Sequence, residues 1–296
     1  MNPLLRRGPT PQGADVGDLA IVIVSHNARE DLDRCLRSLH DPSPRTTHEI
    51  VVVDNASNDG SPEMVRSAWP DVRVIDAGGN LGFSRANNIG IRATSGPLIL
   101  LLNSDTRVPP DAIDRLVGEL GAHAEVAVIG PRLVDAAGRP EISFGRMITP
   151  FNELRQKALG WSYRAGLPFV VGWVSRNTTR AHTPDWISGA CLLVRRTDAE
   201  AVGLLDERFF LYAEDVDFCA AIRARGRLVL FSPVAEIVHL RGRSAGRVPR
   251  AAERLYRVSQ LAFYEKHHPH WSPWLRGYLR IRGRLPHDTP AADAPR

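Results

Sequence analysis

The sequence predicts an α/β fold built on a mostly parallel β-sheet with helices on both faces. Short runs rich in Val, Ile and Leu alternate with segments whose apolar residues recur at helical spacing. Such runs are typical of strands buried on both sides, as in parallel sheets. Repeated strand–helix–strand units need right-handed crossovers, which place the helices against the sheet. Five runs before residue 131 fit this pattern: 20–25, 49–54, 72–76, 97–102 and 126–130.

Helices are predicted between these strands. After the first strand, four apolar residues fall at i, i+3, i+4 and i+7, on one face of a helix: Leu32, Cys35, Leu36 and Leu39. Ser61-Pro62 predicts a second helix, since a serine N-cap is followed by proline at the first helical position. A third is expected over 84–94, after the glycine-rich turn 78–82, and a fourth begins near Pro109-Pro110-Asp111.

The alternation stops beyond Pro131, where residues 140–183 are expected to be irregular. A strand over 186–195, a helix over 215–225, an extended run over 228–239 and a helix over 250–268 are predicted after them.

The domain organisation is expected to have one main domain between two disordered ends. The predicted divisions are a lead-in 1–17, a main domain 18–245, a basic aromatic helical segment 246–285 and a tail 286–296. The main domain divides into a nucleotide-sugar-binding half, 18–135, and an acceptor and catalytic half, 136–245.

Composition indicates a globular protein of a reducing compartment. The 38 basic residues exceed the 33 acidic ones, and arginines crowd between 241 and 284, where phosphate-bearing lipid, nucleic acid or only solvent remain open as contacts. The three cysteines, Cys35, Cys191 and Cys219, are far apart and form no CxxC pair. The early apolar run at 19–24 is too short to span a membrane, and no signal-peptide pattern precedes it. We therefore predict a cytoplasmic protein.

Polar residues follow three of the predicted strands. Ser25-His26-Asn27, Asp54-Asn55 and Asn103-Ser104-Asp105 stand at strand ends, and ligands of such sheets bind beyond the carboxyl ends of the strands. No GxGxxG, GxxxxGK[ST] or GxSxG motif is present, which argues against dinucleotide-binding folds, P-loop nucleotidases and α/β-hydrolases. Asp105 at a strand end is well placed to hold a divalent cation through oxygen ligands.

Six motifs in order resemble those of inverting family 2 glycosyltransferases, which have the GT-A fold. They lie at 21–27, 53–61, 80–88, 101–106, 186–191 and 210–217. The resemblance covers about residues 19–245 and is closest to the bacterial rhamnosyltransferase branch. It implies transfer of a sugar from a nucleotide-diphosphate donor, dTDP-L-rhamnose in that branch, to an acceptor hydroxyl in cell-envelope biosynthesis.

The resemblance also implies roles for the donor side of the site. Asp54 would bind the pyrimidine base, with Asn55 beside it and Ser25, His26 and Asn27 lining the nucleoside. Ser188 and Gly189 would lie under the donor sugar. Asn80 and Arg85 either contact the donor or only shape their loop.

Metal binding and catalysis are implied at further positions. Asn103, Ser104 and Asp105 would contact the donor. Asp105 would also bind Mg²⁺ or Mn²⁺ together with His239, although Asn103 replaces the first acid of the family's DxD element. Asp215 would be the catalytic base, Glu214 would orient the acceptor, and Asp217 would support the loop.

Simpler roles for the same residues stay open. Asp54 could cap the turn that it starts. Acids at 214–217 are also favoured by the helix dipole, and a lone histidine is often structural. A UDP-sugar donor, a nucleotidyltransferase and a non-catalytic nucleotide- or carbohydrate-binding module are the alternative functions. A nucleotidyltransferase, however, needs a glycine-rich basic loop where residues 25–29 stand.

The composition of the C-terminal segment suggests a contact with a membrane surface. Its mixture of Trp, Tyr and Arg suits either an interfacial contact or a helix with an exposed arginine face. We expect a polyprenyl-diphosphate-linked acceptor, peripheral contact at the inner face of the cell membrane, and no nucleic-acid partner.

Overall fold

The computed structural model describes residues 19–240 and 249–286. The predicted lead-in, residues 241–248 and the predicted tail after residue 286 lie outside these described residues. Within them, eight strands form one sheet in the order β3-β2-β1-β4-β9-β6-β10-β5. The strands are β1 (Leu19–Ser25), β2 (His48–Asp54), β3 (Arg73–Asp76), β4 (Leu98–Asn103), β5 (Thr106–Arg107), β6 (Val126–Val134), β9 (Cys191–Arg195) and β10 (Leu228–His239).

The predicted mostly parallel sheet is confirmed. β1 runs parallel to both β2 and β4, β2 is parallel to β3, and β6 is parallel to β10. β9 is the exception in the middle of the sheet, antiparallel to β4 and β6, and β5 is antiparallel to β10 at the edge. The carboxyl ends of β1, β2 and β4 therefore lie together at one rim.

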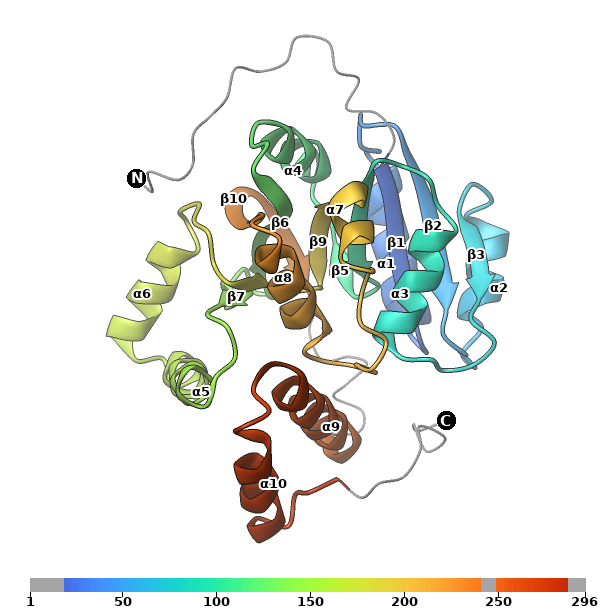
Figure 1. Ribbon diagram of the computed structural model, residues 1–296. Helices are drawn as coiled ribbons and strands as arrows, with labels where there is room; N and C mark the ends of the chain where they lie inside the picture. Colours follow the sequence, from blue (N-terminus) through green and yellow to red (C-terminus); the bar gives the residue numbers. More distant parts are fainter. Residues whose placement is uncertain (1–18, 241–248, 287–296) are drawn as a thin grey trace.

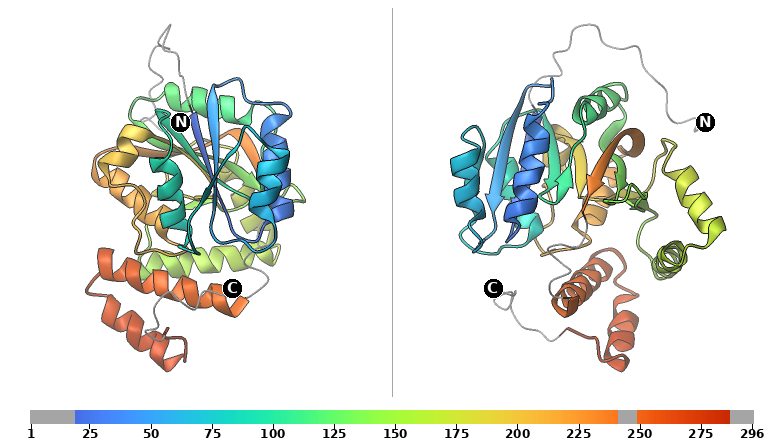
Figure 2. Two further views of the ribbon diagram at one scale, coloured as in Figure 1. Left: turned by 90° about the vertical axis from the view of Figure 1, so that its right-hand side faces the viewer. Right: turned by 180° about the vertical axis from the view of Figure 1, so that it is seen from behind.

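Helices cover both faces of the sheet (Figures 1 and 2). α1 (Arg29–His40), α2 (Ser61–Ala68) and α4 (Ala112–Gly121) pack on the face that carries Ile21 and Ile23. α3 (Phe83–Arg92), α7 (Arg196–Ala201) and α8 (Glu214–Ala224) cover the other. The N-cap of α2 is Gly60, at φ 77°, rather than the expected Ser61, which is the first helical residue.

The expectation of an irregular segment over 140–183 is wrong. It contains a short strand, β7 (Phe144–Gly145), and two helices, α5 (Pro150–Arg164) and α6 (Pro168–Asn177). α5 has no buried residue, so it has no face packed into the core of the kind by which a helix is usually recognised. The missed signal was at its start, where Thr149 caps the helix by accepting a hydrogen bond from Asn152 N and proline follows.

The predicted strand over 186–195 is divided in two. β8 (Trp186–Ile187) pairs with β7, and β9 belongs to the main sheet, with a turn at 188–190 between them. That turn brings Ser188 and Gly189 to the rim rather than leaving them inside a strand.

Two C-terminal helices complete the described structure. α9 (Pro249–His267), as predicted, and α10 (Ser272–Ile281) lie with α5 below the carboxyl ends of the strands in Figures 1 and 2. Phe263 and Tyr264 of α9 pack against Phe209, which precedes α8, and Val216 within it. No helix within residues 19–240 and 249–286 has the length and apolar character needed to cross a bilayer.

Candidate active site

Three strand ends form the floor of the site, as predicted. Ser25 of β1 is in register with Asp54 of β2, and Val24 is in register with Asn103 of β4. The Asn55 backbone N–H donates to Ser25 O over 2.8 Å, and His26 Nδ1 lies 2.8 Å from Asn55 O. Parallel pairing thus joins residues about 30 positions apart in the sequence.

Asp54 stands at the edge of a cavity of about 370 Å³. Its Oδ2 accepts a hydrogen bond from Ser57 N at 3.2 Å, so the predicted turn-capping role is correct for one oxygen. Its Oδ1 is buried without a hydrogen-bond partner among the described residues, and a buried acceptor of this kind is costly unless a ligand satisfies it. The cavity is lined by Asp54, Ala56, Ser57, Pro62, Glu63, Arg66, Asp76, Gly78 and Gly79.

Asn27, in the turn after β1, is hydrogen-bonded to the loop that follows β2. Asn27 has a left-handed backbone, with φ 51°, and its N–H donates to Ser57 Oγ at 3.0 Å. Its side-chain oxygen accepts from Asn58 N at 2.7 Å. Ser25 Oγ is buried and has no hydrogen-bond partner among the described residues, so it is a second polar atom available to a ligand.

The glycine-rich loop is held against both the rim and the segment before α8. Asn55 Nδ2 donates to Asn80 Oδ1 over 2.9 Å, and Leu81 N donates to Asn55 Oδ1 over 2.8 Å. Gly82, at φ 82°, touches Phe210, whose backbone oxygen would lie 2.4 Å from a Cβ at this position. Only glycine fits there, because both its conformation and this close approach exclude a side chain.

Arg85 lies apart from the rim. Its Nε donates to Glu207 Oε2 over 3.0 Å, and Arg92 pairs with the same carboxylate. In this arrangement Arg85 shapes the loop around α3 rather than pointing toward Asp54 or Asp105.

Asp105 and His239 meet next to Asn103. His239 Nε2 lies 3.3 Å from Asp105 Oδ1 and 3.5 Å from Asn103 Nδ2, and its Nδ1 lies 3.1 Å from Glu141 Oε2. Burial disfavours the imidazolium, but hydrogen bonds to Asp105 and Glu141 outweigh it and raise the pKa of His239 to about 9. Sequence reasoning missed Glu141, since an isolated acid in a segment without a motif carries no local signal.

The Asp105–His239 pair fits a divalent cation that takes its other ligands from elsewhere. No group of three or more His, Cys, Asp or Glu side chains within the described ranges could hold a metal alone. Mg²⁺ and related ions commonly bind through one or two carboxylates, water and substrate phosphates. A carboxylate behind the histidine, as Glu141 is here, is the usual partner of a metal-binding imidazole.

Ser104 and Ser188 are placed by the backbone near these groups. Ser104 is buried between Asn103 and Asp105. Ser188 N donates to Ser143 O at 2.8 Å, and Ser188 Oγ accepts from Ala190 N at 3.3 Å. The turn that carries Gly189 is therefore rigid.

Asp215, the second residue of α8, lies beside this turn. Its Oδ2 accepts from Gly189 N at 2.9 Å and its Oδ1 from Val216 N at 2.8 Å, so backbone N–H groups hold both carboxyl oxygens in place. The backbone just before it is strained, since Tyr212 and Ala213 have φ values of 72° and 66°. Non-glycine residues in this region persist only where surrounding structure enforces them, commonly at functional sites.

Glu214 has a different environment from its neighbour. Burial, and then the charge of Asp215, raise the pKa of Glu214 well above its ordinary value. Its Oε2 has no hydrogen-bond partner in the described part of the chain. The two adjacent acids therefore differ in their surroundings, since Asp215 is held by two backbone N–H donors and Glu214 is buried with one oxygen unpaired among the described residues.

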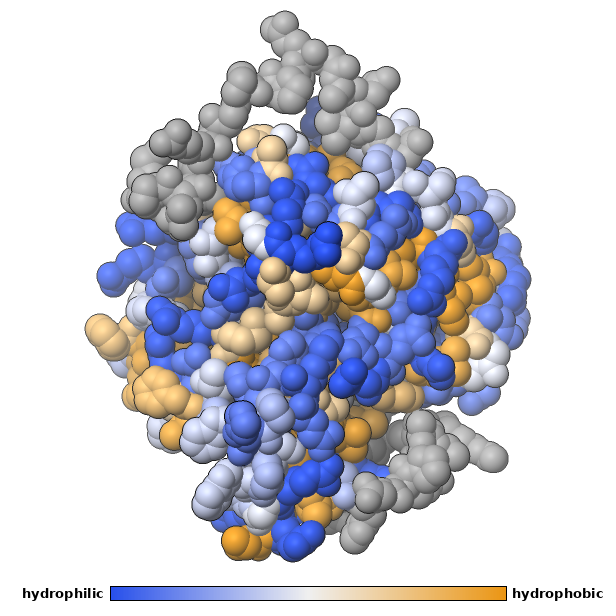
Figure 3. Space-filling model, viewed as in Figure 1, coloured by the Kyte–Doolittle hydropathy of each residue, from blue (hydrophilic) through white to orange (hydrophobic). Residues whose placement is uncertain are grey.

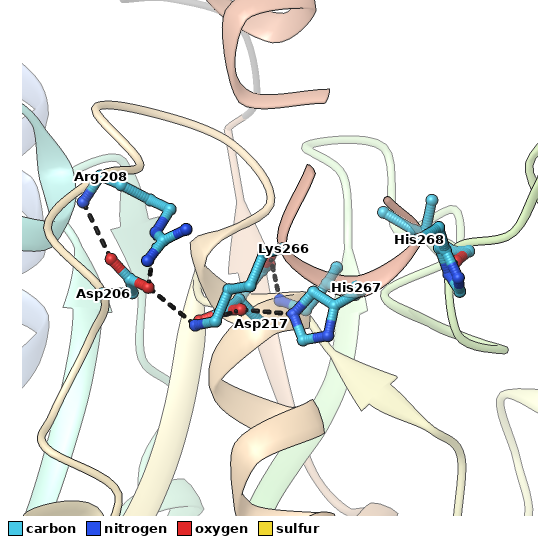
Figure 4. Close-up of polar contacts among 9 residues, drawn as sticks. Asp206, Arg208, Asp217, Lys266, His267 and His268 are labelled. Atoms are coloured by element: carbon cyan, nitrogen blue, oxygen red, sulfur yellow. Dashed lines mark hydrogen bonds and ion pairs between the residues drawn. The ribbon is translucent and has the colours of Figure 1, made fainter. Parts of the chain in front are cut away.

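Asp217 anchors α8 to the C-terminal helices (Figure 4). Its carboxylate is 3% exposed and lies 2.8 Å from Lys266 Nζ and 2.6 Å from His267 Nε2. Lys266 also pairs with Asp206 at 2.7 Å. Ser259 of α9 donates to Leu211 O at 2.7 Å, so α9 holds the strained segment in place.

Comparisons with known proteins agree with this geometry. The model of the family described as glycosyl transferase family 2 matches residues 20–172. The N-acetylglucosaminyl-diphospho-decaprenol L-rhamnosyltransferase of Mycobacterium tuberculosis is 30% identical over 90% of this chain and 92% of its own length. The low-salt glycan biosynthesis hexosyltransferase Agl10 of Haloferax volcanii is 27% identical over 75% of this chain and 67% of its own.

Solved structures share the fold at lower sequence identity. The structure of GalNAc-T7 with UDP, GalNAc and Mn²⁺ matches 91% of this chain and 58% of its own, with a TM-score of 0.59 and 18% identity. The mannosyltransferase PcManGT from Pyrobaculum calidifontis, in complex with GDP-Man and Mn²⁺, matches 89% of this chain and 69% of its own, with a TM-score of 0.58 and 18% identity. Family match, relatives and fold agree, and the chain belongs to glycosyl transferase family 2, the inverting glycosyltransferases that the motifs predict.

Proposed function

We propose that this glycosyltransferase moves L-rhamnose from dTDP-L-rhamnose, with inversion, to a hydroxyl of a polyprenyl-diphosphate-linked sugar in cell-envelope biosynthesis. The Mycobacterium tuberculosis relative, whose name states a lipid-diphosphate acceptor and rhamnosyl transfer, supports the transferred sugar and the class of acceptor. The observation that carries the proposal is the convergence of Asp54, Asp105 with His239, and Asp215 at one rim.

The donor half supplies a nucleoside pocket. The free Oδ1 of Asp54 would accept the ring N–H of thymine, and a pyrimidine nucleoside suits a cavity of about 370 Å³. Uracil presents the same N–H, so a UDP-sugar is the second candidate donor. Ser25, His26, Asn27 and Asn80 would surround the nucleoside and diphosphate.

Asp105 and His239 would hold Mg²⁺ or Mn²⁺, whose charge stabilises the departing diphosphate when the ion is bound. Binding needs the neutral imidazole, so the cation competes with the proton that Asp105 and Glu141 favour on His239. The solved Mn²⁺ complexes of the same fold support a divalent cation.

Asp215 would act as the general base. The acceptor oxygen forms a bond to the anomeric carbon as the bond to the diphosphate breaks, and the hydroxyl proton passes to the Asp215 carboxylate. The raised pKa of Glu214 favours its protonated form, whose free oxygen can donate a hydrogen bond that orients the acceptor. Ser188 and Gly189 would lie under the sugar and hold Asp215 in position.

We further propose the divisions 18–135 for donor binding and 136–245 for acceptor binding and catalysis, on the cytoplasmic side of the cell membrane. The segment 246–285 would make the peripheral contact, since α10 exposes Trp271, Trp274, Tyr278 and Ile281. We propose no nucleic acid among the partners of this protein.

The test is release of nucleoside diphosphate from a donor panel. dTDP-L-rhamnose, UDP-glucose, UDP-galactofuranose and UDP-N-acetylglucosamine would be offered with Mg²⁺ or Mn²⁺ and a lipid-diphosphate sugar. We expect release from dTDP-L-rhamnose that needs the acceptor and is abolished by chelator and by Asp215→Asn. Asp71→Asn, an exposed acid paired with His40, is the matched control and should keep full activity. If only a UDP-sugar releases its diphosphate, the donor is that UDP-sugar and not dTDP-L-rhamnose. An active Asp215→Asn variant would show that Asp215 is not the general base.

A further inference from the structure

The helical hairpin of α5 and α6 exposes large apolar side chains. Phe151, Leu154 and Trp161 of α5 are 73%, 69% and 65% exposed, and Phe169 of α6 is 85% exposed. α5 buries none of its residues and α6 buries only Val174. Figure 3 shows apolar residues over this hairpin, at the left edge of the molecule, and again at the lower tip over α10.

The exposed residues of α5 form a stripe. Steps of three and seven residues separate Phe151, Leu154 and Trp161, so they fall on one side of a helix with 3.6 residues per turn. α10 repeats the pattern, with Trp271, Trp274, Tyr278 and Ile281 separated by three, four and three residues. We call the three α5 residues the α5 stripe.

Basic residues flank the α5 stripe. By helical spacing, Arg155 lies on one side of it and Arg164 on the other, and both are exposed. Lys157, on the same side of the helix as Arg164, pairs instead with Glu153 at 2.5 Å. Residues 150–180 contain five basic side chains and one acid, Glu153. Apolar and aromatic residues bordered by Lys and Arg are the pattern of helices that lie in the interface of an anionic bilayer.

The opposite side of α5 is already occupied. Glu153 accepts hydrogen bonds from Tyr256 OH at 2.9 Å and Tyr264 OH at 3.0 Å, both on α9. Tyr163 OH donates to Pro140 O at 2.9 Å, which ties the far end of α5 to the main domain. The helix therefore packs on the protein with its polar side and turns the α5 stripe outward.

We propose that the α5 stripe and the turn into α6 dock on the surface of an anionic lipid bilayer. α5 lies below the carboxyl ends of the strands, on the side of the site (Figures 1 and 2). The hairpin thus acts as a second membrane contact beside the C-terminal segment and brings the acceptor half to the lipid. This docking depends on the proposed function only in assuming that the acceptor is a lipid-linked sugar.

Vesicle flotation of the full chain, without donor or acceptor, tests this docking. We expect binding to phosphatidylglycerol-containing vesicles at low salt, little binding to phosphatidylcholine alone, and loss of binding at high salt. The triple variant Phe151→Ser/Leu154→Ser/Trp161→Ser should lower the partition coefficient by about tenfold or more. Arg155→Gln and Arg164→Gln should each lower it roughly fivefold, on anionic vesicles only.

Matched variants separate the hairpin from the rest of the basic surface. Arg115→Gln changes an exposed arginine of α4, at the opposite end of the molecule, and should leave binding unchanged. The triple variant should keep its melting temperature, because the replaced side chains are exposed. It should also keep nucleoside diphosphate release with a short-chain, water-soluble acceptor.

Two results would overturn the proposal. One is unchanged flotation of the triple variant while Trp274→Ser/Ile281→Ser on α10 abolishes binding. The other is a wild-type dimer in light scattering that the triple variant converts to a monomer without loss of vesicle binding. Absence of sugar transfer from every donor would overturn the proposed function and leave the flotation result standing, so the two failures are distinguishable.

Discussion

Replacing Lys266 with methionine is expected to loosen α8, the helix that carries the proposed base. Lys266 Nζ lies 2.8 Å from the Asp217 carboxylate, which is 3% exposed. Removing one partner of a buried ion pair typically costs about 3–5 kcal/mol. His267 remains as a donor at 2.6 Å, and Lys266 is itself 30% exposed, so we expect a loss below this range, about 2–3 kcal/mol. For a chain of this size that corresponds to a melting temperature lower by roughly 3–5 °C.

Thermal and denaturant unfolding of Lys266→Met, Asp217→Asn and the double variant would measure the interaction. Since the two groups touch, the loss of unfolding free energy in the double variant should be smaller than the sum of the losses in the two single variants by about 1–3 kcal/mol. Arg276→Met is the matched control, because Arg276 and Glu265 are both about half exposed and such a pair contributes about 0–1 kcal/mol.

Activity adds a second readout of the same contact. Displacement of α8 moves Asp215 relative to the donor, so we expect kcat to fall in Lys266→Met with little change in the KM for the donor. A loss of stability no larger than that of Arg276→Met, or strict additivity in the double variant, would refute the reasoning.

Three other outcomes are expected. Gly82→Ala should abolish activity and lower the free energy of unfolding by several times the ~1 kcal/mol expected for Gly78→Ala. Both glycines have positive φ, but only an alanine at position 82 would clash with Phe210. Equal losses of stability and of nucleotide release in the two variants would show that the clash does not matter. Asp105→Asn should remove Mn²⁺-dependent binding of nucleoside diphosphate in calorimetry, and retained metal dependence would exclude Asp105 as a ligand. Burial opposes ionisation of Glu153, but the lysine, amide and hydroxyl donors around it outweigh burial and lower its pKa. Its stabilisation is therefore present above about pH 4.3 and is lost as the pH falls through the lowered folded-state pKa; acid unfolding of Glu153→Gln should lack this component, and identical profiles would contradict it.

The sheet and the floor of the site could be predicted from local sequence patterns alone. Apolar runs identified the parallel strands, and their carboxyl ends had to meet, which placed Ser25, Asp54 and Asn103 together at one rim. Family motifs added Asp215 and His239, whose roles remain proposals. These inferences succeed because strand burial and strand-end position are properties of short stretches of sequence.

The distant side chains that complete the site could be identified only after the chain had folded. Glu141 meets His239 across 98 positions, and Asp217 meets Lys266 across 49. α5 was missed because its exposed apolar stripe has no buried counterpart, so its sequence showed no core-facing periodicity. Local patterns report a segment's own burial and turn chemistry, whereas partner choice between segments depends on how the whole chain packs, and that information appears only once the elements are assembled.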